Sequence, residues 1–242
     1  MEQRIKQEMK NIDFHMHTTY SDGNSSPGTL VRDARISGLD AIAICDHDHI
    51  QGYFDALPEA RKYGLDLVPG TEITTGDYHI LGLGFNPEDE KFLKFLEHSR
   101  ELQEKNTKGK IEMLRKEGVP INFEDLRNFF PSSRLGSGNV LTYLVSNKKT
   151  REYLHSRGIE KREQTMNFIK KVKSNFNDFD VNPENAIREI KSAGGIAIIA
   201  HPFKQVQNMK ELDYLVSVGL DGLEVQPNYN GRNEPFREYA LE

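Results

Sequence analysis

Strand-like and helix-like segments alternate over the first 85 residues of this chain. Four short apolar segments have a strand pattern, over residues 11–16, 41–45, 65–69 and 78–85. Between them, Ser26 and Pro27 can cap a helix that reaches Gly38, and residues 54–63 form a second helix that Gly64 ends. Alternation of this kind produces parallel strands joined by helical crossovers, so the sequence predicts an α/β fold.

The alternation stops at residue 87 and resumes near residue 183. Residues 88–182 are charged and helical in period, without a convincing strand, and are too long for a plain loop. Beyond them, helices are expected over 183–193, 209–218 and from 234, with strands over 196–200 and 222–226. We therefore expect a discontinuous domain of residues 1–87 and 183–242, interrupted by a helical insertion domain of residues 88–182.

Composition excludes several classes of protein. Thirty-two Lys and Arg against 37 Asp and Glu give a net charge of −5, so no strong binding to duplex DNA or to an anionic membrane is expected. The single cysteine, Cys45, excludes an internal disulfide framework, and its apolar surroundings predict a buried, inert thiol. A charged first segment and the lack of a long apolar stretch predict a cytoplasmic protein.

Histidines gather at the ends of the expected strands. His15 and His17 are two residues apart in a strand, so their side chains project to the same face and can hold one metal ion. A second cluster of histidines and acids occupies residues 46–49. Of the eight histidines, only His98 and His155 lie away from strand ends, and we expect both on the surface of the insertion.

Two further candidates follow the same logic, because active-site residues of parallel barrels lie at the carboxyl ends of strands. Glu72 follows the third expected strand, and His201 ends the strand after the insertion. His79 is near the start of its strand, so that strand must run differently or a loop must supply the ligand. Nitrogen and carboxylate ligands suit Zn²⁺, Mn²⁺ or Fe²⁺, and a structural thiolate zinc site is disfavoured by the lack of other cysteines.

Several motifs together resemble the polymerase-and-histidinol-phosphatase (PHP) family of metal-dependent phosphoesterases. They are Asp-Phe-His-Met-His-Thr-Thr-Tyr-Ser-Asp-Gly at 13–23, Cys-Asp-His-Asp at 45–48, Pro-Gly-Thr-Glu at 69–72, His-Ile-Leu-Gly-Leu-Gly-Phe at 79–85 and Gly-Gly-Ile-Ala-Ile-Ile-Ala-His-Pro at 194–202. The place of the insertion is similar to that in the branch of nucleotide and RNA 5′-end phosphoesterases. The resemblance implies a distorted seven-stranded (βα) barrel with two or three divalent metal ions.

The resemblance also implies the metal ligands, which are His15, His17, Asp22, His47, Glu72, His79 and His201. Glu72 would bridge a first metal, bound by His15 and His17, to a second metal, bound by His79 and His201. Asp22 and His47 would belong to a third site. Asp48 is the candidate catalytic residue, expected with Asp46 to orient His47 rather than to bind metal. His49 is expected to be exposed or to lie behind the ligands.

The family normally adds ligands from a Ser-Asp-x-His segment after a further strand. This sequence has no such segment and ends at Leu241 and Glu242. We therefore expect that it stops before the last part of the barrel, the alternative being a site that natively lacks those ligands.

Two basic residues are candidates for binding substrate. Arg134 stands in Pro-Ser-Ser-Arg-Leu-Gly-Ser-Gly-Asn, where related proteins carry an arginine that faces the substrate, and a guanidinium can grip phosphate oxygens. An ordinary capped loop is the alternative. Lys204 follows His201 closely and is a similar candidate. The basic run at residues 161–173 is expected to be a solvated helix face rather than an RNA-binding track.

These features predict a phosphoesterase that hydrolyses a phosphate ester of a nucleotide, or of the 5′ end of a short nucleic acid, with a metal-activated water. Three alternatives stay open. A histidinol-phosphate phosphatase is the nearest, although the long insertion disfavours it. A hydrolase of C–N bonds also uses His-x-His on a barrel, but its bridging lysine has no candidate here. A non-catalytic module that binds metal or nucleotide is the third.

Overall fold

A computed structural model describes residues 11–76, 78–172, 181–225 and 234–240. Six strands of this part of the chain form one curled sheet in the order β1-β2-β3-β4-β5-β6. The strands are β1 (Ile12–Met16), β2 (Ala41–Ile44), β3 (Asp66–Thr74), β4 (His79–Leu83), β5 (Ile196–Ile199) and β6 (Gly222–Leu223). The α/β fold expected from the sequence is confirmed; the seventh strand of a complete barrel remains a prediction.

The direction of β4 confirms one of the two alternatives left open for His79, namely that its strand runs differently, and the sheet is therefore not all parallel. β1, β2 and β3 are parallel to one another, but β4 is antiparallel to both β3 and β5. Only a few residues separate Thr74 from His79, too few for a helical crossover, so the chain has to turn back. His79 therefore pairs with Thr74, and the start of β4 lies at the same edge of the sheet as the end of β3.

β3 is longer than its sequence pattern indicated, because it continues through Pro69 and Gly70 to Thr74. Gly70 permits this continuation: a Cβ atom there would lie 2.8 Å from both the Cys45 sulfur and the backbone oxygen of Ile44. Glu72 is consequently inside a strand rather than in the loop after it, and its backbone is fixed by pairing with Leu81.

Alternating side chains of the strands build two different layers. Ile42 and Ile44 point outward and pack against α1 (Pro27–Ile36) and α2 (Gln51–Tyr63). Ala43 and Cys45 point to the inside of the curl, where Leu81, Leu83 and Ala200 complete a small core. As the sequence indicated, the Ser26 side chain caps α1 by accepting a hydrogen bond from the backbone N–H of Thr29.

A second group of helices covers β4 and β5. It comprises α8 (Pro183–Ser192), α9 (Met209–Ser217), α10 (Glu234–Tyr239) and the first turns of α3 (Glu90–Lys116), and a short 3₁₀ helix, η1 (Pro202–Lys204), follows β5. Ile80 and Ile199 are fully buried beneath these helices. Gln226 and Leu241, which the sequence placed in the last strand and helix, lie outside the described residues.

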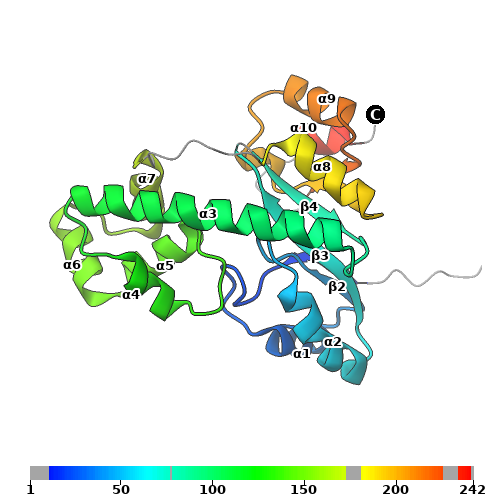
Figure 1. The fold of residues 1–242 in the computed structure, drawn as a ribbon, viewed down its shortest axis with the longest axis horizontal. Helices are drawn as coiled ribbons and strands as arrows, with labels where there is room; N and C mark the ends of the chain where they lie inside the picture. Colours follow the sequence, from blue (N-terminus) through cyan, green and yellow to red (C-terminus); the bar gives the residue numbers. More distant parts are fainter. Residues whose placement is uncertain (1–10, 77, 173–180, 226–233, 241–242) are drawn as a thin grey trace, which may run out of the picture.

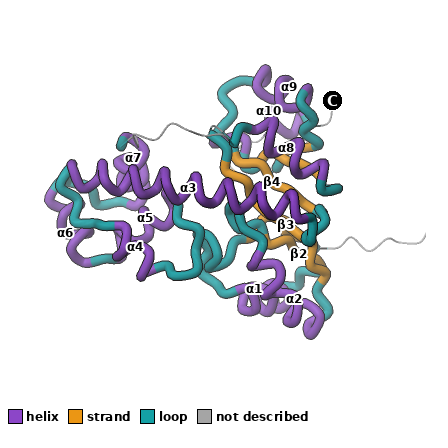
Figure 2. The backbone as a smooth tube through the Cα atoms, viewed as in Figure 1, coloured by secondary structure: helices purple, strands orange, loops and turns teal. Residues whose placement is uncertain are grey.

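Every described element between Glu90 and Lys171 is a helix. After α3 come α4 (Phe123–Phe129), α5 (Ser137–Ser146), α6 (Lys148–Ser156) and α7 (Arg162–Lys171). Figures 1 and 2 show α3 crossing from the sheet to this group, which stands to one side of it. Phe92 at one end of α3 is buried with the sheet, whereas Leu114 at the other end belongs to a separate core among the helices. Such a separate core is what an insertion domain requires, although its boundaries remain a prediction.

No helix among the described residues is long and apolar enough to cross a lipid bilayer.

Candidate metal centre and substrate cavity

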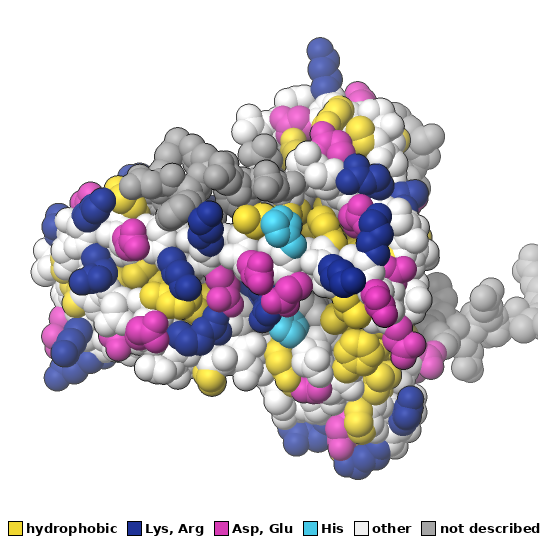
Figure 3. All heavy atoms as spheres, viewed as in Figure 1, with side chains coloured by type: hydrophobic (Ala, Val, Ile, Leu, Met, Phe, Trp, Pro, Cys, Tyr) yellow, Lys and Arg dark blue, Asp and Glu magenta, His cyan; other side chains and the backbone are white. Residues whose placement is uncertain are grey.

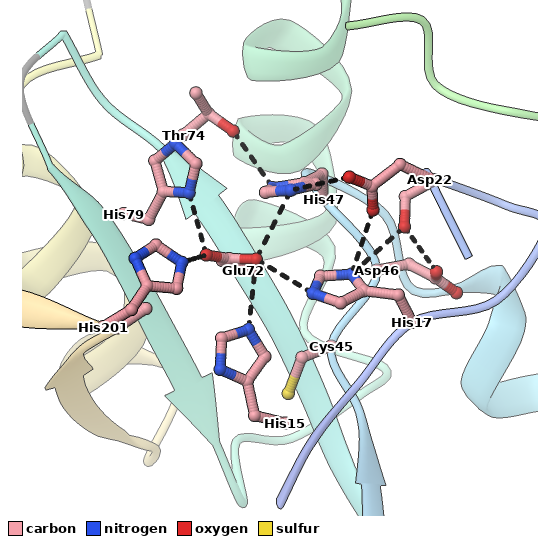
Figure 4. Close-up of polar contacts among 12 residues, drawn as sticks. His15, His17, Asp22, Cys45, Asp46, His47, Glu72, Thr74, His79 and His201 are labelled. Atoms are coloured by element: carbon pink, nitrogen blue, oxygen red, sulfur yellow. Dashed lines mark hydrogen bonds and ion pairs between the residues drawn. The ribbon is translucent and has the colours of Figure 1, made fainter. Parts of the chain in front are cut away.

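The carboxylate of Glu72 is surrounded by imidazole rings (Figure 4). The rings belong to His15, His17, His47, His79 and His201. Glu72 is 1% exposed, and its Oε1 atom lies 2.8 and 2.9 Å from nitrogens of the last two rings. Its Oε2 atom lies 3.2 Å from a ring nitrogen of His15, 3.1 Å from one of His17 and 3.4 Å from one of His47. One carboxylate therefore has two groups of imidazoles, one at each oxygen.

Each ring reaches this point from a different part of the sheet edge. His15 is in β1 and His17 follows it, and both reach the same Glu72 oxygen, as their spacing predicted. His47 follows β2 and forms an isolated bridge with Glu72. His79 opens β4, and His201 follows β5, so the strand reversal is what completes the cluster.

The backbone of His201 is held in a rare conformation. Its φ of 31° and ψ of 57° lie in the left-handed region, which residues with a side chain seldom adopt. The carboxylate of Glu224 accepts a hydrogen bond from its backbone N–H at 2.6 Å, and Gln205 contacts its ring Nδ1 atom. These contacts hold the His201 ring against Glu72 in spite of the local strain.

Glu224 is a site residue that the sequence analysis missed. Its Oε1 atom lies 3.2 Å from the Nδ1 atom of His15, and it also holds the backbone of His201. Glu224 comes directly after β6, just as His201 comes shortly after β5. The strand-end rule did not identify it, because the strand was expected over residues 222–226 and Glu224 stood inside it; it also lies in no motif that the family resemblance supplied.

The charges of the cluster are strongly coupled. Burial alone would raise the pKa of Glu72, but His47 and hydrogen bonds from neighbouring rings hold that pKa well below its usual value. Burial alone would lower the pKa of His15, but hydrogen bonds to Glu224 and Glu72 raise it to about 10. Burial lowers the pKa of His47 to about 4. Neutral and protonated imidazoles thus share one buried carboxylate, a state that bound cations would replace.

Asp22 adds a second carboxylate beside two of the rings. Its oxygens lie 3.6 Å from His17 Nδ1 and 4.0 Å from His47 Nε2. Burial would raise the pKa of Asp22, but these two histidines lower it below its usual value. A Cβ atom on Gly138 of α5 would lie 2.7 Å from an Asp22 oxygen, so a glycine is needed where the helices approach this side chain.

The donor atoms fit divalent metal ions. The structure contains two sets of potential ligand atoms, and within each set the atoms lie within 4.8 Å of one another. One set comes from His15, Glu72 and His201, and the other from His17, His47 and Glu72. Imidazole nitrogens with a shared carboxylate are suitable for Zn²⁺, Mn²⁺ or Fe²⁺. Glu72 joins both sets, as expected of a bridge, but His15 groups with His201 rather than with its neighbour in sequence.

Asp46 does not orient His47, contrary to the sequence-based expectation. Its carboxylate accepts hydrogen bonds at 2.7 Å from the backbone N–H of Thr18 and from the hydroxyl of Ser21. The Ser21 oxygen lies 3.2 Å from Nδ1 of His17. Asp46 therefore fixes the loop after β1 and supports His17, because its side chain turns toward that loop.

Asp48, the candidate catalytic residue, also differs from the expectation. Its carboxylate accepts hydrogen bonds from Arg134 Nη2 and Ser99 Oγ, both at 2.7 Å, and from the backbone N–H of Thr74 at 3.0 Å. The contact to His47 comes from Thr74, whose hydroxyl lies 3.3 Å from Nδ1 of that ring. Asp48 has a positive φ of 50°, which directs its side chain toward α3 and Arg134. We therefore regard Asp48 as a residue that positions Arg134.

A cavity of about 620 Å³ lies between the metal centre and the helical part of the chain. The five clustered histidines, Asp22, Glu72 and Glu224 line it, together with residues of α3, α5 and α7. Both candidate substrate-binding residues line it: Arg134 is 6% exposed, and Lys204 is exposed at the rim. Lys110 and Lys170 also line it, so one residue of the basic run faces the cavity; Lys173 of that run lies outside the described residues.

Other residues follow the sequence-based predictions. Cys45 is fully buried, and burial raises the pKa of its thiol well above the usual value. His98 and His155 are exposed on the helices. His49 stacks on Tyr20 and accepts a hydrogen bond from the first residue of α2, away from the ligands. On the face in Figure 3, basic and acidic side chains are interspersed, as the balanced composition predicts.

A curled α/β sheet that gathers imidazoles and carboxylates at one edge defines a barrel-type metalloenzyme. The chain belongs to the PHP domain family, whose model matches residues 13–154. A 5′-3′ exoribonuclease of Haemophilus influenzae is 33% identical over 224 residues, which cover 89% of this chain and 79% of the relative. A 3′,5′-nucleoside bisphosphate phosphatase of Chromobacterium violaceum is 25% identical over 96% of this chain and 82% of the relative. The crystal structure of a protein described as a metal-dependent phosphoesterase from Bifidobacterium adolescentis superposes with a TM-score of 0.76 at 27% identity. The superposition covers 96% of this chain and 83% of that protein.

Proposed function

We propose that this protein hydrolyses a phosphate ester of a nucleotide, or of the 5′ end of a short nucleic acid, with two or three divalent metal ions. The observation that carries the proposal is the position of Glu72, whose two oxygens face separate groups of imidazoles at the floor of a nucleotide-sized cavity. The relatives support the same class of substrate, since their names specify RNA and a nucleoside bisphosphate.

In this proposal, Glu72 is the bridging ligand. His15, His201 and Glu224 would hold one ion with it, and His17 and His47 would hold another. His79 contacts the same Glu72 oxygen as His201 does. Asp22 reaches the second group and can serve a third ion. Divalent ions such as Mn²⁺, Zn²⁺ or Fe²⁺, if held by these residues, would supply activation of a water molecule and neutralisation of charge on the phosphate oxygens.

The protein side chains around the metals supply orientation. Thr74 accepts a hydrogen bond from Arg134 at 2.7 Å and can accept another from Nδ1–H of His47. That arrangement leaves Nε2 of His47 unprotonated and directed at Asp22 and Glu72, as a metal ligand must be. Arg134 itself is anchored by Asp48 through one nitrogen, which leaves the rest of its guanidinium for a substrate phosphate.

The test is metal-dependent release of phosphate. Protein stripped with a chelator should not hydrolyse nucleoside monophosphates, nucleoside bisphosphates or 5′-phosphorylated oligoribonucleotides, and Mn²⁺, Zn²⁺ or Fe²⁺ should restore the activity. His79→Ala should abolish most of it, because that ring contacts the bridging carboxylate at 2.8 Å. His98→Ala, at an exposed position on α3, is the matched control and should retain it.

Two outcomes would overturn the proposal. A clear preference for histidinol phosphate over every nucleotide would move the protein to the neighbouring class of phosphatase. Tight binding of metal and nucleotide without any hydrolysis would indicate the non-catalytic module.

A further inference from the structure

We propose that Lys110, Ser137 and Lys170 form a subsite for a second phosphate group of the substrate, separate from the phosphate that is hydrolysed at the metals. The inference rests on the proposed function and deepens it, since it assigns selectivity for substrates with two phosphates to the helical part of the chain.

The first observation is a set of cations without anionic partners. Lys110 of α3 donates a hydrogen bond to the Ser137 hydroxyl at 2.9 Å, a neutral acceptor. Among the described residues, neither Lys110 nor Lys170 forms an ion pair with a carboxylate, although both line the cavity. Burial, together with the nearby charges of Arg134 and Lys170, lowers the pKa of Lys110. Positive charges held together in a hollow are stabilised when an anion enters it.

The second observation is the orientation of α5. This helix begins at Ser137, and the Gly136–Gly138 stretch at its N-terminus lines the same cavity. The Gly136 N–H donates to Asn139 Oδ1 at 2.9 Å. The backbone N–H groups that follow it in the first turn and the positive end of the helix dipole favour a bound anion at such a position. The hydroxyl of Ser137 and the ammonium of Lys110 are therefore placed beside backbone donors of the kind that bind phosphate.

The third observation is independent of the helix and concerns Arg134. This residue is 6% exposed and lines the cavity, yet its Nε atom is buried and makes no hydrogen bond among the described residues. A Cβ atom on Gly136 would lie 2.3 Å from its Nη1 atom, so the glycine leaves space for the guanidinium. A buried donor without a partner costs stability unless a ligand satisfies it.

Two chemically different sets of residues line the cavity. The candidate metal ligands come from the edge of the sheet, whereas Lys110, Ser137 and Lys170 belong to α3, α5 and α7. A volume of about 620 Å³ is suitable for a mononucleotide. A substrate with one phosphate at the metals can therefore place a second phosphate against the lysines, and the charge of Arg134 acts on both Asp22 and Lys110.

The experiment crosses substrate with variant. Adenosine 3′,5′-bisphosphate is compared with the two adenosine monophosphates, using the parent, Lys110→Met and Lys170→Met. Lys171→Met is the matched control, because Lys171 is the next residue of the same helix and is exposed outside the cavity. Lys110→Arg keeps the charge and tests rescue. A 5′-phosphorylated dinucleotide distinguishes a terminal phosphate from one within a chain.

We expect each methionine variant to lower kcat/KM for the bisphosphate by about ten- to a hundredfold, the loss typical of a hydrogen bond to a charged group. For the monophosphates, kcat/KM should stay within about twofold, and Lys110→Arg should recover most of the loss. An equal loss on both kinds of substrate, or none on either, would overturn the subsite.

Calorimetric titration of the metal-free protein with the bisphosphate separates failure of the subsite from failure of the proposed function. If no substrate is hydrolysed but both methionine variants bind the bisphosphate more weakly than Lys171→Met does, the subsite stands and the catalytic proposal fails. If all variants bind it equally, the subsite is wrong whatever the activity.

Discussion

Replacing Glu72 with Gln should remove two metal ions at once. The substitution keeps the size of the side chain but exchanges the carboxylate for a neutral amide, which is a poor bridge between two cations. In the structure Glu72 is the one described residue that belongs to both ligand sets, that of His15 and His201 and that of His17 and His47. Glu224→Gln is the matched control, because Glu224 contacts only the ligand set of His15, Glu72 and His201, through the His15 ring and the backbone of His201.

The magnitude follows from ligand linkage. An ion present at a hundred times its Kd stabilises the folded protein by about 2.7 kcal/mol, so two ions add roughly 5 kcal/mol. For a domain of this size, about 2–4 °C of Tm accompanies each kcal/mol, so saturating metal should raise the Tm of the parent by roughly 10–20 °C. We expect Glu72→Gln to lose most of this increase and Glu224→Gln to lose at most about half of it.

The assay pairs thermal unfolding, with and without Mn²⁺, with elemental analysis after dialysis. Each variant is compared with its own metal-free form, so the effect of the substitution on the bare fold cancels. Retention of the parent's metal content and Tm increase by Glu72→Gln would refute the assignment of Glu72 as the bridge.

Three further predictions follow from the same contacts. Arg134→Ala should raise KM for nucleotides with unchanged metal content. It should also lower the free energy of unfolding by about 3–5 kcal/mol, because it leaves the buried carboxylate of Asp48 without its charged partner. Denaturant unfolding of this variant and of the Asp48→Asn, Arg134→Ala double variant checks this, and equal losses in both would contradict it. The Cys45 thiol should react with iodoacetamide in the native protein far more slowly than in urea even at pH 9, because burial raises its pKa; labelling followed by mass spectrometry decides, and rapid native labelling would show that the thiol is accessible. Metal affinity should fall as the pH is lowered, because the pKa of His15 is raised to about 10 in the metal-free protein and metal binding must displace its proton. The protonated ring also stabilises the metal-free protein. That stability is complete below about pH 6.5 and is lost as the pH rises through about 10. Calorimetry in buffers of different ionisation enthalpy should detect proton release at pH 8, and its absence would show that His15 is already neutral there.

The sequence by itself determined the local elements and identified most of the side chains that gather around Glu72. Ser26 caps its helix as predicted, because capping depends on side chains only a few residues apart. His15 and His17 share a target because the period of a strand puts them on one face. Cys45 is buried because the apolar run around it forms a central strand. Each of these inferences depends on neighbours along the chain.

The tertiary structure alone decided how distant parts meet. β3 continues to Thr74, beyond its sequence pattern, and this leaves a connection too short for a crossover, so β4 reverses and His79 reaches the candidate metal centre. Asp48 pairs with Arg134, 86 residues away, instead of supporting His47, its neighbour in sequence. Glu224 contacts His15 across 209 residues. The approach of α3, α5 and α7 similarly converts Lys110 and Lys170 from apparent surface charges into one wall of a cavity. Local pattern sets which face a side chain occupies, whereas its partner is set by packing between elements that the sequence separates.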